Sequence, residues 1–303
     1  MVVLFYVGIA HILLFIIGGI LNIYALYCLL KFKKTNNDLQ FGNLEKLLLA
    51  LNASDLLACL VSGPMKIIVY MILISSIQQR FTFIVDFFCQ FSSTSIITMI
   101  AINNCIKITR FSTYDSLVTD TRINNFIRAT FIVSALTLLV PILISPAFSL
   151  ALMVLTVLTS LIVMVISYVT IVKELKRSDE KIRNEATAEG KRRVKRENKV
   201  SKTILILMTC FFMCTILPTI VAGIGYFLFG LEVFKTTMPF IVLVVNLNTI
   251  SNPCIYVLKN SKYRLKLFRK TKTEDNNQET KSNPRRNQDL NKKSSSIFIV
   301  KAN

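Results

Sequence analysis

Polar side chains interrupt the last hydrophobic segment, where a membrane helix is expected to be apolar. The sequence Asn248-Thr249-Ile250-Ser251-Asn252-Pro253-Cys254-Ile255-Tyr256 places two amides, a proline and a phenol there. Proline leaves one backbone carbonyl without its helical donor, and an amide in hydrocarbon needs a hydrogen-bond partner. These groups can exchange hydrogen bonds or coordinate a cation, so we expect them to face a packed protein interior.

Three further segments place polar residues at depths close to those of the last one. With a rise of about 1.5 Å per residue from the nearest lysine, Asn22, Asp55 and Asn252 lie roughly 10–14 Å above the inner membrane boundary. Asn248 and Ser93 lie a turn or more higher. The residues of this polar layer must therefore come from different helices that pack against one another.

Asp55 is the only acid of this layer. An ionised aspartate at this depth costs at least ~2.5–3.5 kcal/mol, so it needs partners, a cation or a proton. One hypothesis is that Asp55, with Ser93, Asn248 and Asn252, holds a hydrated sodium ion. The alternative is a structural network in which Asp55 is neutral or bridged by water. No other cofactor is expected.

The elements that position these residues are membrane spans. Of 303 residues, 53% are hydrophobic, and the mean hydropathy is +0.55. Seven segments are long enough to cross a bilayer at about 20 residues each. They lie near 3–30, 47–71, 81–106, 126–147, 149–172, 203–228 and 236–258, with Pro141 and Pro146 marking the reversal between the fourth and fifth. The predicted fold class is an all-α membrane protein, a seven-transmembrane helix bundle.

The charge pattern predicts the orientation. Of 36 Lys and Arg residues, only Lys66, Arg80 and Lys235 fall on the side shared with the N-terminus. By the positive-inside rule the N-terminus is extracellular and the C-terminus cytoplasmic, as in a multi-pass protein of the plasma membrane. The net charge of +19 is then mostly a topology signal. Nucleic-acid binding is not expected, because it would need a soluble basic domain.

The cytoplasmic parts are longer than the outer ones. We expect residues 173–202 to extend the fifth and sixth spans as helices, and 259–268 to form a short amphipathic helix on the inner leaflet. The seven-transmembrane domain thus covers 1–270, and 271–303 is expected to be a polar, disordered tail. The basic segments 191–202 and 259–272 are expected to contact anionic lipids, or alternatively serve only as topology determinants.

Cysteine placement and the rarity of histidine exclude other classes. All seven cysteines lie in or beside the spans, so no extracellular disulfide is expected. Asn52-Ala53-Ser54 matches a glycosylation sequon, but it lies within the second span and should be unused. His11, the single histidine, is expected to pack or to bond a neighbouring helix. No nucleophilic or metalloprotease arrangement appears, so we expect no enzymatic activity.

These residues resemble the rhodopsin-like (class A) family of G-protein-coupled receptors. Asn22, Asp55 with the residues before it, the 248–256 motif and Leu217-Pro218 match its patterns in order and spacing. The resemblance implies a sixth span that pivots at Pro218 near Phe212. It also implies that Tyr168 and Tyr256 meet through water in the active state, with Pro253 shaping the seventh span.

The departures from the family bear on signalling. Where the family has an Asp-Arg-Tyr triplet, the third span reads Asn103-Asn104-Cys105, and Asn104 has neither the charge nor the length of arginine. Asn104 and Lys107 are nevertheless the expected G-protein interface. Ile216 stands at the usual sixth-span tryptophan, and Gln79 at the usual disulfide cysteine.

Asp86 is the candidate ligand-binding residue in the outer half of the bundle. It shares one helical stripe with Ser93 and Asn104, so it points inward. Cys89, Gln90 and Asn246 complete the predicted site. A carboxylate there suits a cationic amine, but Lys66 or Arg80 could equally neutralise it, and a lipid or neutral ligand is the third alternative.

The sequence therefore predicts a receptor that senses a small extracellular ligand and signals through heterotrimeric G proteins. The first alternative is a receptor-like protein that binds a ligand or partner without coupling to G proteins, because the arginine is missing at Asn104. The second alternative is a transporter or channel, which would require a continuous polar path through the bundle.

Overall fold

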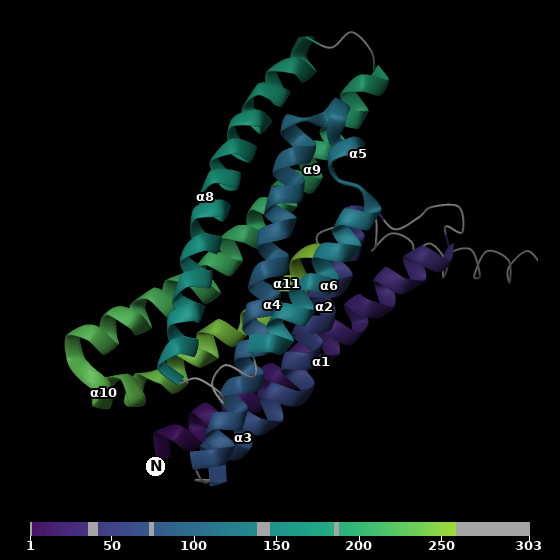
Figure 1. Cartoon of the computed structure of the whole chain (residues 1–303). Helices are drawn as coiled ribbons and strands as arrows, with labels where there is room; N and C mark the ends of the chain where they lie inside the picture. The colour runs from purple at the N-terminus through teal and green to yellow at the C-terminus, as the bar shows by residue number, and fades with distance from the viewer. Residues whose placement is uncertain (1, 36–41, 73–75, 138–145, 185–187, 259–303) are drawn as a thin grey trace, which may run out of the picture. The chain divides into compact units, whose positions relative to one another are not determined.

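Helices account for nearly all of the chain whose placement is described. The computed structural model describes residues 2–35, 42–72, 76–137, 146–184 and 188–258 (Figure 1). The long helices and their continuations are α1 Val2–Thr35, α2 Asn43–Leu57, α3 Gly63–Ile72, α4 Ser76–Thr109, α6 Asp120–Thr137, α8 Pro146–Asn184, α9 Ala188–Phe211, α10 Leu217–Asn246 and α11 Asn248–Pro253. A 3-10 turn, η2 Phe111–Thr113, and the short α5 Tyr114–Leu117 connect α4 to α6.

Six segments among the described residues are long and apolar enough to cross a membrane. They are Tyr6–Lys31, Asn43–Ile68, Ile84–Thr109, Val154–Ser178, Asn198–Gly225 and Thr237–Tyr256. The predicted fourth span, 126–147, corresponds to α6 and continues into 138–145, which lie outside the described residues. Six of the predicted spans are thus confirmed by length and composition. The fourth span, 126–147, stays a prediction.

Helix α4 lies at the centre of the bundle. It packs against α2, α3, α6, α8 and α9, and its residues Ile96, Ile97, Ile100 and Ala101 have no exposed surface. Large apolar side chains of α8, such as Ile162 and Val169, are about 60% exposed. An apolar surface of this kind is what a helix presents to lipid.

Three spans contain a wider, π-helical turn next to a proline. η1 Ala58–Ser62 precedes Pro64, η3 Phe212–Ile216 precedes Pro218, and η4 Cys254–Leu258 follows Pro253. Because proline has no backbone N–H and crowds the preceding turn, a wider turn nearby accommodates the bend. The sixth-span bend predicted at Pro218 coincides with η3.

Residues 173–202 are helical wherever they are described, which confirms the predicted extensions of the fifth and sixth spans. α8 runs to Asn184 and α9 begins at Ala188, and the two helices pack against each other (Figure 1). The connection between the predicted spans 203–228 and 236–258 is not an irregular loop. Helix α10 runs through it, broken only at Gly230, whose φ of 77° lies in the left-handed region that favours glycine.

The inner end of the bundle is the end that holds Lys31, Lys46 and Lys107, and the outer end is the end that holds His11, Lys66 and Asp86. The predicted amphipathic helix at 259–268 and the domain boundary at 270 lie outside the described residues.

Candidate functional site

An ion pair occupies the outer end. Lys66 Nζ of α3 lies 2.6 Å from Asp86 Oδ1 of α4, and the same oxygen accepts a hydrogen bond from Ser62 Oγ at 2.9 Å. Lys66 is only 4% exposed. Of the alternatives open for Asp86, these contacts support neutralisation by Lys66, since each buried charge has its counter-ion. The side chain of Arg80 lies outside those described.

Asn246 of α10 also contacts this pair. Its Oδ1 accepts a hydrogen bond from Lys66 Nζ at 3.3 Å, and the residue is 1% exposed. The other two predicted ligand-binding residues lie elsewhere. The Cys89 carbonyl accepts a hydrogen bond from Ser54 of α2 at 3.2 Å, and Gln90 is half-buried, its Oε1 without a partner among the described residues.

An aromatic side chain of α1 supports the lysine. Lys66 Nζ lies 5.8 Å from the centroid of the Phe15 ring, within the range of a cation–π contact. Phe15 also stacks on His11, with centroids 5.8 Å apart. Gly63 makes room for the ring, because a Cβ at that position would lie 2.5 Å from Phe15 Cγ. Neither Phe15 nor Gly63 is polar, so no pattern in the sequence predicts that they support the ion pair.

The polar layer predicted from depth forms one network around Asp55. Ser93 Oγ donates to Asp55 Oδ1 at 3.2 Å, and Asn252 Nδ2 donates to Asp55 Oδ2 at 2.7 Å. Asp55 and Asn248 are each 2% exposed. The oxygens Asn248 Oδ1 and Asn252 Oδ1 are buried and have no hydrogen-bond partner among the described residues. Carboxylate and amide oxygens of this kind suit a hard cation.

Within the described residues, no group of three or more His, Cys, Asp or Glu side chains is placed to hold a metal ion. A cation in the central network would therefore depend on one carboxylate and on neutral oxygens.

Asn22 supplies the hydrogen-bond donor that the proline of the seventh span lacks. Pro253 lacks the N–H that the Thr249 carbonyl, four residues earlier, would accept in a helix. Asn22 Nδ2 donates to that carbonyl at 2.8 Å and to the Gly18 carbonyl at 2.8 Å. Asn252 and Tyr256 are at most 3% exposed. The prediction that the motif faces a packed interior is confirmed.

Asn52 links the network to the inner end of the bundle. Its Nδ2 donates to the Asn22 carbonyl at 3.0 Å, and its Oδ1 accepts from the Tyr256 hydroxyl at 2.7 Å. The sequence places Asn52 in an unused sequon and in the second-span pattern before Asp55, and neither predicts these two contacts. Its role depends on the rotation of α2 against α1, which spacing along one chain does not determine.

The predicted switch residues are not all brought together. Pro218 is buried at the end of η3, and Phe212 begins that turn half-buried. The neighbouring Phe211 and Ile216 have no exposed surface. Tyr168 is 42% exposed on α8, whereas Tyr256 bonds to Asn52, so this conformation does not bring the two tyrosines together.

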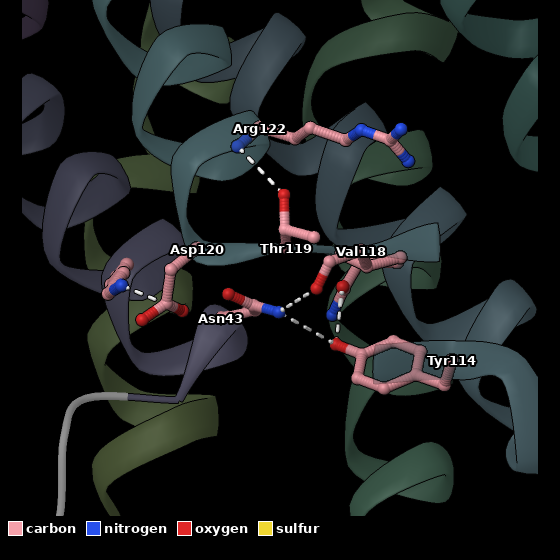
Figure 2. A network of polar contacts seen from close by, with 8 residues as sticks. Asn43, Tyr114, Val118, Thr119, Asp120 and Arg122 are labelled. Carbon is pink, nitrogen blue, oxygen red and sulfur yellow. Dashed lines mark hydrogen bonds and ion pairs between the residues drawn. The ribbon is translucent and has the colours of Figure 1, made fainter. Parts of the chain in front are cut away.

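The connection between α4 and α6 is fastened to α2 at the inner end. Figure 2 shows Asn43 pointing at this connection: its Nδ2 donates to the Val118 carbonyl at 2.8 Å and lies 3.5 Å from the Tyr114 hydroxyl. Tyr114 donates in turn to Asn103 Oδ1 at 2.8 Å. Burial raises the pKa of the Tyr114 phenol, so the hydroxyl retains its proton. Lys46 Nζ pairs with Asp120 at 2.9 Å.

Asn104 connects α4 to the sixth span. Its Oδ1 accepts a hydrogen bond from Ser201 Oγ of α9 at 3.3 Å, and the residue is 2% exposed. A second neutral bond, from Ser178 Oγ to Asn198 Oδ1 at 3.2 Å, joins α8 to α9. Lys107 is exposed, with its Nζ 5.9 Å from the Tyr114 ring centroid.

A cavity of about 300 Å³ lies at this inner end. Residues of α2, α4, the connection after α4, and α9 line it, among them Asn43, Asn104, Lys107, Tyr114 and Ile204. Asn104 and Lys107, predicted as a partner interface, thus lie on the wall of one cavity.

The comparison with known proteins agrees with this geometry. The family model described as 7 transmembrane receptor (rhodopsin family) matches residues 145–256. No curated protein matches the chain. The matched segment holds the fifth, sixth and seventh predicted spans, including Pro218 and the 248–256 motif. The resemblance of this chain to the rhodopsin-like receptors is therefore confirmed over residues 145–256, and the multi-pass membrane architecture agrees with it.

Proposed function

We propose that this protein is a plasma-membrane receptor, with its N-terminus outside, that signals through heterotrimeric G proteins when a small extracellular ligand binds. The observation that carries the proposal is the hydrogen bond between Ser201 and Asn104 at the inner end. It closes α9 against α4 beside the cavity that Asn104 and Lys107 line. Movement of α9 about the bend at Pro218 would break this bond and widen the cavity for a G protein.

The hydrogen bond between Ser201 and Asn104 is weaker than a contact that involves a charged group. A neutral hydrogen bond contributes about 0.5–1.5 kcal/mol, whereas one to a charged group contributes about 1.5–3 kcal/mol. Asn104 and Ser201 are both uncharged, so the closed state is held weakly at this point. We therefore expect measurable activity without ligand.

A sodium ion in the central network belongs to the same proposal. Asp55, Ser93, Asn248 and Asn252 are its ligands, and the two unpaired amide oxygens support this assignment. The ion would supply positive charge beside the Asp55 carboxylate. Asn252, which bonds Asp55, also belongs to the seventh span, so cation binding would hold the second and seventh spans together.

The experiment is nucleotide exchange on purified G proteins, with the full-length protein in lipid vesicles that contain anionic lipids. The native protein should accelerate exchange, and Ser201→Ala should raise the rate without ligand by up to about tenfold, because one bond of the closed state is lost. Thr203→Val is the matched control, since the Thr203 hydroxyl bonds only along its own helix, to the Lys199 carbonyl at 3.0 Å.

The alternative is a receptor-like protein that does not couple to G proteins. The neutral, buried state of Asn104 favours it, because no cation is available at that position for a partner. Exchange by the native protein would remove this alternative. Silence of the native protein and of Ser201→Ala across the G-protein subtypes, with activity restored by Asn104→Arg, would overturn our proposal.

A further inference from the structure

The outer ion pair has bonding capacity that its own partners do not use. Asn246 is 1% exposed, yet its Nδ2 has no hydrogen-bond partner among the described residues. Two of the three Lys66 ammonium protons have acceptors, at Asp86 Oδ1 and Asn246 Oδ1. Both contacts to Asp86 go to Oδ1. The pair thus presents an unpaired amide donor and a remaining carboxylate oxygen.

The direction of the Asn246 amide is determined by Lys66. The ammonium can only donate, so the amide oxygen must face it and the NH2 group must point elsewhere. Reversing the amide would place two donors against each other. The Asn246 Nδ2 group is therefore held as an unpaired donor close to Lys66, where a ligand can offer it an acceptor.

We propose that the site binds a small zwitterion of the free α-amino acid type. Its carboxylate accepts hydrogen bonds from Asn246 Nδ2 and the Lys66 ammonium, and its ammonium pairs with Asp86. This assignment rests on the proposed receptor function for its meaning, but binding itself does not require G-protein coupling. The ligand approaches from Asp86, whose side chain is 22% exposed against 5% for Lys66.

Charge balance separates a zwitterion from the two simpler ligands. An amine would bring a second cation to a carboxylate that Lys66 already neutralises, and a simple carboxylate would bring a second anion beside Asp86. A zwitterion keeps the site neutral and alternates the signs of four charges. It also satisfies the Asn246 donor, which an amine leaves unpaired at a cost.

The experiment uses matched compounds on the purified full-length protein in nanodiscs, with no G protein present. Each common amino acid that has an apolar side chain is tested beside its decarboxylated amine and the acid without its amino group, for example leucine, 3-methylbutylamine and 4-methylpentanoate. We expect an amino acid to bind at least about tenfold more tightly than either partner compound. The proposal is overturned if no amino acid binds, or if the amine binds as tightly.

Two substitutions should reverse the preference. Lys66→Met removes the cation, so the amine should now bind at least about tenfold more tightly than the amino acid. Asp86→Asn should shift the preference to the carboxylic acid. Lys173→Met, an exposed lysine on α8, is the control and should leave the native preference unchanged. An unchanged preference in both site variants contradicts the proposal.

A double variant covers the case in which a lone buried charge prevents folding. Lys66→Met with Asp86→Asn removes both charges together and leaves no unpaired ion. It should lose at least about tenfold in amino-acid affinity while its thermal unfolding stays cooperative. Native affinity in this folded variant would refute the proposal. If the native protein binds an amino acid but does not accelerate nucleotide exchange, G-protein coupling fails and the binding proposal stands.

Discussion

Replacing Gly63 with alanine should disturb the outer ion pair through its neighbour Phe15. A Cβ at residue 63 would lie 2.5 to 2.8 Å from three atoms of the Phe15 ring, where ordinary contact begins at 3.4 Å. The ring must therefore shift by about 1 Å. It is only 5% exposed, and Leu14 and Cys59 form a cluster with it. Overpacking of this kind typically costs about 1–3 kcal/mol.

The chain offers a matched control for this substitution. No atom lies within 4 Å of a Cβ built at Gly223 in α10. Gly223→Ala should therefore be neutral, or stabilise the helix by up to about 1 kcal/mol. Gly63, unlike Gly223, stands directly before a proline, Pro64, whose ring disfavours a Cβ on the preceding helical residue. The difference between the two alanine variants therefore measures the contact with Phe15 together with this backbone effect, and a Phe15→Leu background separates the two.

Thermal unfolding in nanodiscs, followed by a thiol-reactive dye, suits this chain because its seven cysteines are free, three of them buried and four partly buried in the folded state. Gly63→Ala should lower the melting temperature by several degrees, at about 2–4 °C per kcal/mol. In a Phe15→Leu background the same change should cost less, since the smaller side chain leaves space. Equal costs in both backgrounds, or equal melting temperatures for the two alanine variants, would refute the reasoning.

The central network gives two further predictions. Asn22→Leu removes the donor to the Thr249 carbonyl that Pro253 leaves free, so it should lower the free energy of unfolding by about 2 kcal/mol; denaturation without a shift would show that the carbonyl finds another donor. Sodium should raise the melting temperature of the native protein above its value in potassium or choline, and Asp55→Asn should abolish this difference. Equal melting temperatures in all three salts would exclude the ion.

Depth counting predicted which residues meet in the polar layer. Asp55, Ser93 and Asn252 come from three spans, and their side chains bond as expected. The count works because a membrane helix crosses the bilayer nearly straight, so the distance from its charged end measures depth. Lys66 was one of two residues proposed as the counter-ion of Asp86, and the structure places it there.

Rotation and side-chain direction could not be predicted in the same way. The contact between Asn104 and Ser201 was missed, because the family comparison drew attention to a missing charge and Ser201 is a small residue in a basic segment. The sequon and the second-span pattern that contain Asn52 do not predict that it joins Asn22 to Tyr256. Gly63 and Phe15 meet only because α1 crosses α3 closely. Each of these contacts depends on how two helices turn toward each other.

The hydrogen bonds of the seventh span connect the outer ion pair to the inner end. Lys66 donates to the side-chain amide of Asn246. The backbone carbonyl of Asn246 accepts from the Thr249 hydroxyl at 2.8 Å. The Thr249 carbonyl accepts from Asn22, and the Asn22 carbonyl accepts from Asn52, which holds the Tyr256 hydroxyl.

Every step of this connection involves a buried polar group, and a buried group that loses its partner costs about 1–3 kcal/mol. A ligand that draws Lys66 or Asn246 toward itself would therefore change the hydrogen bonding at Thr249, three hydrogen bonds from Tyr256. The energy that such a shift can transmit is comparable to the one neutral bond between Asn104 and Ser201. If the protein signals as proposed, an input of modest size at the outer end would therefore be sufficient, in energy, to open the inner end.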